Sequence, residues 1–125
     1  DYTELDMYLA QIAYKDRTDY TISTTEAGPM KPGDVDPTPY TDKLLNGATY
    51  ENADDVEAPD GEYVVLNFPK DKVRFDFFLA EGSENVIREV WGDNEQIYTA
   101  TFTDDSIKAS AVMQDWYHAL MENAQ

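Results

Sequence analysis

The sequence predicts a single α+β domain in which an antiparallel meander of four or five strands carries an N-terminal and a C-terminal helix on one face. Two observations lead to this fold class. Four short apolar segments follow one another between residues 62 and 102, with connections too short for anything except antiparallel neighbours. An amphipathic segment over residues 109–120 comes next and has the apolar spacing of a helix. The length of 125 residues suggests that one domain occupies residues 1–125.

The N-terminal segment 3–14 predicts a helix, and the segment 20–25 predicts an edge strand. Thr3 is placed to cap the helix, and Glu4 and Asp6 suit the positive end of its dipole. Residues 20–25 alternate in the β-branched and aromatic pattern of a strand. Four apolar residues recur at the spacing of one helix face: Leu5, Tyr8, Leu9 and Ile12.

The meander begins after the turn signal Asp60-Gly61 and ends in the C-terminal helix, which Asp104 and Asp105 are expected to start. The predicted strands cover residues 62–68, 73–80, 86–91 and 96–102. The apolar stripe of the helix consists of Ala109, Val112, Met113, Trp116 and Leu120. His118, the one histidine, lies about 180° from that stripe. We therefore expect it to be exposed, which argues against histidine-based catalysis or metal binding.

Alternation of side chains along the strands separates a helix side from a far face. If Phe75 faces the helix, then Asp76 and Arg88 lie opposite each other on the far face as a favourable cross-strand pair. The same register turns Glu89 inward, between Phe75 and Tyr98. The other residues expected on the helix side are Val64, Leu66, Phe68, Val73, Phe77, Leu79, Ile87, Trp91, Ala100 and Phe102.

Residues 26–61 differ in character from the rest of the chain. Four prolines and two glycines before residue 40 argue against regular structure, and only a short helix over residues 40–46 is expected. Six acids then occur in the twelve residues 51–62 without a base. A solvated charge run is the favoured interpretation. The weaker alternative is a Ca²⁺ site built from Asp54, Asp55, Glu57 and Asp60.

The charge balance bounds the partners. The 26 acids and 9 bases give a net charge of −17, which disfavours direct binding to nucleic acid and favours a cationic ligand or a basic protein. The absence of cysteine excludes disulfides and thiolate chemistry. No apolar run approaches the roughly 20 residues of a membrane span. No glycine-rich phosphate motif occurs, so no cofactor is expected.

Because the chain begins with Asp1 rather than Met, we interpret it as a processed, extracytoplasmic product, secreted or lipid-anchored, with a cytoplasmic location as the alternative.

The far face of the sheet is the first candidate binding surface. It is too apolar to be left bare in a monomer, so we expect either the 26–61 loop or a partner to cover it, as a homodimer contact or a ligand groove. The candidate residues are Tyr63, Val65, Arg74, Phe78, Arg88, Val90 and Ile97 on the sheet, with Tyr40 and Tyr50 in the loop.

Glu89 is the second candidate, as the one acid that the register drives inward. A buried carboxylate with a raised pKa can serve as a general acid or base. The alternative is a carboxylate at the sheet rim that accepts a hydrogen bond from Tyr98. The catalytic interpretation is the weaker one because no second group for acid–base chemistry accompanies Glu89 in the pattern.

Three functional hypotheses follow, in decreasing order of support. The first is a non-catalytic binding module that uses the far sheet face and the 26–61 loop to hold a protein or a small ligand. The second is an acidic decoy or inhibitor that occupies a basic, nucleic-acid-binding surface of another protein. The third is an enzyme acting through Glu89.

Overall fold

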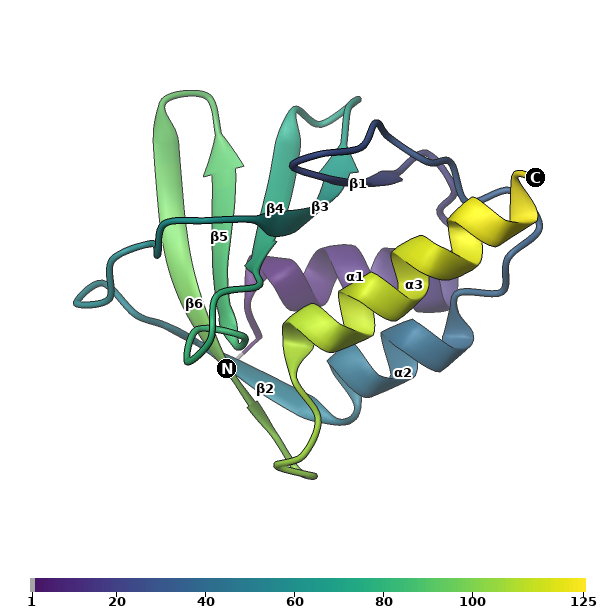
Figure 1. Cartoon of the computed structure of the whole chain (residues 1–125). Coiled ribbons are helices and arrows are strands. Elements are labelled where there is room, and N and C mark those ends of the chain that lie inside the picture. Colours follow the sequence, from purple (N-terminus) through teal and green to yellow (C-terminus); the bar gives the residue numbers. More distant parts are fainter. Residues whose placement is uncertain (1) are drawn as a thin grey trace.

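Three helices and six strands make up residues 2–125, the part of the chain that the computed structural model describes (Figure 1). The elements in chain order are α1 (Glu4–Lys15), β1 (Thr21–Thr24), α2 (Thr38–Leu45), β2 (Ala48–Asn52), β3 (Tyr63–Phe68), β4 (Val73–Phe78), β5 (Val86–Trp91), β6 (Asn94–Phe102) and α3 (Ala109–Asn123). The predicted α+β class is confirmed, with a helix near each end of the described chain.

All six strands form one antiparallel sheet in the order β1-β3-β4-β5-β6-β2. The predicted meander is present as β3 to β6. Strand β6 begins at Asn94, so Glu89 pairs with Gln96 and lies diagonal to Tyr98, which pairs with Ile87. The predicted register of β3 to β5 is confirmed. Asp76 pairs with Arg88, and Phe75 pairs with Glu89. The sheet has six strands rather than four or five because the predicted edge strand β1 and the unpredicted strand β2 both join it.

Strand β2 corrects the expectation that residues 26–61 lack regular structure. It pairs with β6 from Ala48 opposite Phe102 to Asn52 opposite Tyr98. The prolines that argued against a strand lie before residue 40 or at Pro59, outside the paired segment. The acidic residue of the strand, Glu51, is exposed, and a charged side chain is well tolerated on an edge strand.

Helix α1 begins at the predicted cap. The Thr3 hydroxyl accepts a hydrogen bond from the Asp6 amide at 3.2 Å, and the Asp6 carboxylate accepts one from the Thr3 amide at 2.9 Å. This reciprocal pair is a capping box. Towards its other end the helix is held to the β3–β4 turn by Asp71, which accepts from the Tyr8 hydroxyl at 2.9 Å and forms an ion pair with Arg17 at 2.8 Å.

Helix α3 begins at Ala109, and not at Asp104 and Asp105 as expected. Asp104 instead holds a turn by accepting a hydrogen bond from the Ser106 amide at 3.0 Å. The first amide of the helix, that of Ala109, donates to the Asn85 side-chain oxygen at 2.8 Å. Asn85 lies in the β4–β5 connection, so a distant part of the chain caps this helix. The residues next to Ala109 therefore do not indicate where the helix begins.

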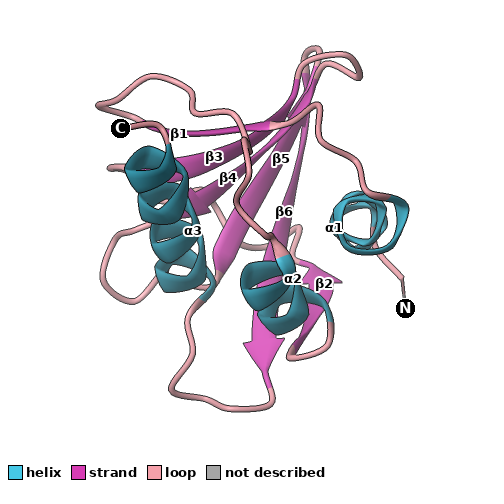
Figure 2. Cartoon of the chain, turned by 90° about the vertical axis from the view of Figure 1, so that its right-hand side faces the viewer, coloured by secondary structure: helices cyan, strands magenta, loops and turns pink. Residues whose placement is uncertain are grey.

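All three helices lie on one face of the sheet, as predicted for the two terminal ones (Figure 2). The two terminal helices are not each other's main neighbours, because α2 lies between them and packs against both. Trp116 of α3 is fully buried at the centre of this layer, where the rings of Tyr20 and Tyr40 pack against it at 5.5 and 5.6 Å. Trp91, expected on the helix side, is 37% exposed because it lies at the tip of the β5–β6 hairpin.

The far face is crossed by the chain itself. Three strands, β4, β5 and β6, lie between β3 and β2 in the sheet, so the connection from β2 to β3 has to cross them. Figure 1 shows this crossing segment, residues 53–62, running in front of β5 and β6. Its ends are tied to the sheet by the Ala53 amide, which donates to the Ile97 carbonyl at 2.9 Å, and by the Leu79 amide, which donates to the Glu62 carbonyl at 3.0 Å.

We predict that Trp116→Ala lowers the free energy of unfolding by about 3–5 kcal/mol, because it truncates a fully buried aromatic side chain. The matched substitution His118→Ala lies two residues further along the same helix, at an exposed position, and should cost less than about 0.5 kcal/mol. Urea titrations monitored by circular dichroism measure both values. Equal losses for the two variants would contradict the buried face assigned to α3.

Candidate functional site

The far-face residues singled out in the sequence do lie together, but they form a second small core instead of an open surface. The Arg88 guanidinium stacks over the rings of Tyr63 and Phe78 at 5.4 and 5.1 Å, and it pairs with the fully buried Asp76 at 2.9 Å. Arg74 binds the other oxygen of Asp76 at 3.0 Å. Tyr63, Val65, Arg74, Arg88 and Val90 are half-buried.

Phe78 and Ile97 are buried outright, with exposed fractions of 1% and 7%. Their burial follows from the topology, since the crossing segment lies over this face of the sheet. The far face is therefore covered by the protein's own 26–61 region, one of the two alternatives expected from the sequence. Neither Phe78 nor Ile97 is available to a partner in this arrangement.

Tyr40 and Tyr50 lie on the opposite side, among the helices. The Tyr40 ring stacks on Trp116 with an interplanar angle of 7°. The Tyr50 hydroxyl donates to the Leu44 carbonyl at 2.5 Å, which ties β2 to the end of α2. The two tyrosines thus contribute to the main core and do not extend the far face.

The four acids considered for Ca²⁺ are spread along the crossing segment. Asp54 accepts a hydrogen bond from Gln96 at 3.0 Å, and Asp54 and Glu57 line a small hollow of about 330 Å³ beside the start of β6. Asp55 and Asp60 do not line it. Among residues 2–125 no group of three or more His, Asp or Glu side chains is arranged to hold a metal ion.

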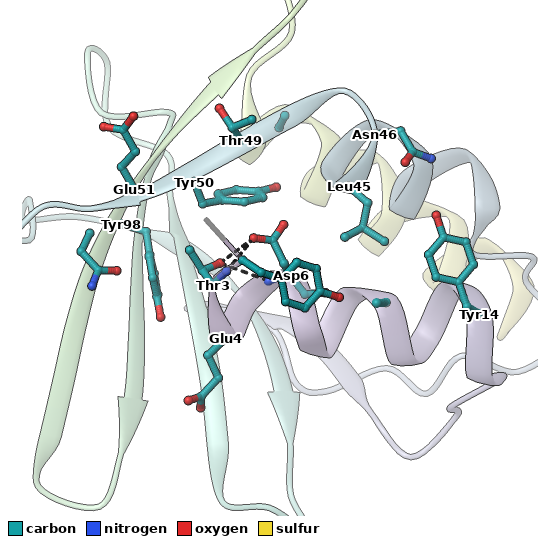
Figure 3. A pocket seen from close by; sticks show the side chains of 14 residues that line it. Thr3, Glu4, Asp6, Tyr14, Leu45, Asn46, Thr49, Tyr50, Glu51 and Tyr98 are labelled. Atoms are coloured by element: carbon teal, nitrogen blue, oxygen red, sulfur yellow. Dashed lines mark hydrogen bonds between the residues drawn. The ribbon is translucent and has the colours of Figure 1, made fainter.

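A hollow lies between α1 and β2, and we call it the α1–β2 groove (Figure 3). It has a volume of about 980 Å³. None of its described lining residues is a lysine or an arginine. They are Tyr2, Thr3, Glu4, Asp6, Ala10, Tyr14, Leu45, Asn46, Ala48, Thr49, Tyr50, Glu51, Asn52 and Tyr98.

One wall of the groove is the whole of β2. This strand is the last of the sheet and pairs with β6 alone. The Gly47 carbonyl accepts from the Thr103 amide and the Ala53 amide donates to Ile97, so the odd-numbered residues turn their backbone groups towards β6. In an antiparallel ladder the residues between them, Ala48, Tyr50 and Asn52, turn theirs to the free edge. The groove is thus bordered by an edge strand whose outward backbone donors and acceptors have no partner among residues 2–125.

The other wall is one stripe of α1, formed by residues 3, 6, 10 and 14. These positions recur every three or four residues and so share one side of the helix. Figure 3 shows Asp6 and Tyr50 facing each other across the middle of the groove, with Tyr14 near Leu45 at one end and Glu4 with Tyr98 at the other. From Thr3 to Tyr14 the helix rises by about 16 Å.

Aromatic and acidic groups dominate the chemistry of the groove. Tyr50 and Tyr98 are buried, whereas Tyr2 and Tyr14 are exposed at the rim, Tyr14 by 65%. The Asp6 carboxylate, part of the α1 capping box, lies at the floor. Aromatic rings and carboxylates are the two kinds of group that attract cations.

Glu89 lies beneath the Glu4 end of the groove, and its predicted inward position is confirmed. It is 1% exposed and accepts a hydrogen bond from the Tyr98 hydroxyl at 2.6 Å through Oε1. Burial, together with the hydrogen bond and the charge of the neighbouring Glu4 carboxyl, raises the pKa of Glu89 from its ordinary value of 4.5 to about 7, against the opposing effect of the Tyr98 hydrogen bond. Burial also raises the pKa of the Tyr98 hydroxyl.

The sequence pattern does not identify Glu4 as a member of the candidate site. The pattern assigns it only a favourable charge at the start of α1, yet in the structure it supplies a second carboxyl group beside Glu89. A weak signal existed, because Glu4 precedes the apolar stripe of a helix that has to pack near Glu89. The remaining groove residues depend on β2, and no local pattern placed that strand beside α1.

No protein-family model, curated protein or solved structure matches this chain. None of the helices within residues 2–125 has the length and apolar character needed to span a bilayer.

We predict that Glu89→Gln raises the free energy of unfolding of the protein without a ligand by about 1–3 kcal/mol above about pH 7.5. A carboxyl group whose pKa is raised on folding lowers stability wherever it is ionised in the native state. The gain should shrink as the pH falls from about 7 to about 4.5, where the Glu89 carboxyl is protonated in the native state. Urea titrations across this range measure the difference, and a gain that is independent of pH would contradict the raised pKa.

We also predict that Phe78→Asp lowers the free energy of unfolding by at least about 3–5 kcal/mol, because it places a charge at a position that is 1% exposed. The same change at the half-buried Val90 of this face should cost less. Urea denaturation compares the two variants. A fold of unchanged stability that had lost self-association in sedimentation would show instead that the far face is a partner surface.

Proposed function

We propose that this protein is a non-catalytic binding module that holds a basic peptide segment of another protein in the α1–β2 groove. The observation that carries the proposal is the free edge of β2, all five residues of which line the groove, with the α1 stripe that carries Asp6 on the other side. An extended peptide can add to such an edge as a seventh strand.

The size of the groove supports an extended peptide as the ligand. Its α1 wall extends for about 16 Å from Thr3 to Tyr14, a length that about five extended residues cover at about 3.3 Å each. The outward backbone groups of Ala48, Tyr50 and Asn52 would pair with alternate residues of the peptide. The intervening peptide side chains would then point towards the sheet or towards the exposed rings of Tyr2 and Tyr14.

The charge of the groove supports a basic sequence. Glu4, Asp6 and Glu51 border it, no described lining residue is basic, and the whole chain has a net charge of −17. Lysine and arginine side chains pair with carboxylates and stack on aromatic rings. The same charge attracts a basic partner over a distance at low salt, so the association rate should fall as the salt concentration rises.

The groove takes the place of the far face in the binding hypothesis because the crossing segment already covers the far face. An acid–base role for Glu4 and Glu89 would explain why the two carboxyls lie together, but it would explain no other feature of the groove. A peptide ligand also accounts for the free strand edge, the tyrosines of the rim and the absence of basic residues from the described lining.

The proposal predicts that Asn52→Pro weakens peptide binding by about tenfold or more. Proline removes the outward amide of Asn52, whereas the amides that pair with β6 remain. The probe is the acetylated and amidated octapeptide Gly-Ser-Lys-Ser-Gly-Lys-Ser-Gly, titrated into the ¹⁵N-labelled protein and followed by NMR. Amide shifts should concentrate in residues 3–14 and 48–52.

Asn52→Ala is the matched control, because it keeps the backbone amide and should bind the peptide as the unaltered protein does. Equal affinities of the proline and alanine variants would show that the strand edge is not used. Shifts confined to residues 53–62 would favour the acidic decoy hypothesis instead. Circular dichroism of both variants checks that the fold is retained.

A further inference from the structure

One buried polar atom beside the α1–β2 groove has no partner. Glu89 is 1% exposed, and its Oε1 accepts the Tyr98 hydroxyl at 2.6 Å. Its second oxygen, Oε2, has no hydrogen-bond partner among residues 2–125. The Glu4 carboxyl lies next to Glu89 and can share a hydrogen bond with it only while one of the two groups carries a proton. When both are ionised, the buried Oε2 has no donor, which is costly.

Two side chains that neighbour the Glu89 carboxyl are themselves groove residues. Tyr98 and Glu4 both line it, and Figure 3 shows the Tyr98 hydroxyl and the Glu4 carboxylate pointing the same way from β6 and α1. Tyr98 is fixed in the sheet, whereas Glu4 is exposed on the first turn of α1. A rotation of the Glu4 side chain is therefore the change that would bring a ligand group to Glu89 Oε2.

We propose that Glu4, Glu89 and Tyr98 form a subsite for the primary ammonium group of a lysine side chain, presented by the peptide in the α1–β2 groove. This inference rests on the proposed function and adds to it the chemical group that is recognised. The ammonium group would donate to Glu89 Oε2, to a carboxylate oxygen of Glu4 and to the phenol oxygen of Tyr98.

The acceptors favour an ammonium group over the other cations that proteins present. An ammonium nitrogen carries three donors that point in separate directions, which suits three oxygens on three different residues. A guanidinium group prefers both oxygens of one carboxylate, and Glu89 Oε1 is already occupied by Tyr98. A trimethylammonium group has no donor and would leave Glu89 Oε2 unsatisfied.

Binding of the ammonium group should release a proton. Around neutral pH the empty subsite holds one proton on Glu89, whose neighbours are Glu4 on α1 and Tyr98 on β6, with Asp6 on α1 acting on Tyr98. The incoming cation replaces that proton, so affinity should rise from about pH 6 to about pH 8, where the lysine remains charged. The buried carboxyl that destabilises the empty fold thereby becomes favourable in the complex.

The test compares four peptides of the sequence Gly-Ser-Xaa-Ser-Gly-Xaa-Ser-Gly, in which Xaa is lysine, arginine, trimethyllysine or norleucine. Isothermal titration calorimetry on the unaltered protein should give an affinity for the lysine peptide that is about tenfold or more above that for each of the others. In Glu89→Gln the preference for lysine over arginine should fall below about twofold. Glu81→Gln, an exposed acid of the β4–β5 turn, is the matched control and should keep the preference.

The outcomes separate the subsite from the groove. If lysine and arginine peptides bind equally and shift the amides of residues 48–52, the ammonium subsite is overturned and the peptide groove stands. If no peptide shifts those amides, both proposals fall. If butylamine alone binds as tightly as the lysine peptide, the subsite serves a free amine and its peptide form is wrong. Retention of the lysine preference by Glu89→Gln, with its amide spectrum otherwise native, would also overturn the subsite.

Discussion

Pairing of β2 with β6 places β2 at the edge of the sheet opposite β1. Both the covered far face and the α1–β2 groove depend on this pairing. Because β3 belongs near the other edge, the chain after β2 has to return across three strands. The returning residues 53–62 cover the far face and convert Phe78 and Ile97 from surface into core. The same pairing leaves a free strand edge beside α1, which is the wall of the α1–β2 groove.

The sheet carries two buried carboxylates, and the contrast between them locates the chemistry. Asp76 lies on the far face, with one oxygen paired to Arg74 and the other to Arg88, so its charge is compensated on both sides. Glu89 lies on the helix side, where Tyr98 donates to one oxygen, Glu4 is the neighbouring acid, and the other oxygen has no donor within residues 2–125. The buried ion pairs of Asp76 have a structural role. The Glu89 carboxylate has no such counter-ion, and a cation from outside the protein would compensate its charge.

Helix α1 belongs both to the core over the sheet and to the α1–β2 groove. Its apolar stripe packs on the sheet, and its contacts to Asp71 fix its orientation. With those contacts made, the neighbouring stripe that begins at Thr3 and Asp6 has to face β2 across the groove. The capping box serves both purposes, since it starts the helix and also holds the Asp6 carboxylate at the groove floor.

The sequence by itself determined those features that depend on short-range pattern. Alternation in residues 63–102 gave the meander, its register, the Asp76–Arg88 pair and the inward position of Glu89, because tight turns leave few ways to align neighbouring strands. The 3.6-residue period gave the buried faces of α1 and α3. The tertiary structure alone decided where β2 pairs, what caps α3 and which acid meets Glu89. Each of these brings together residues far apart in the chain, such as Glu4 with Glu89 or Asn85 with Ala109, and no local periodicity records such a meeting.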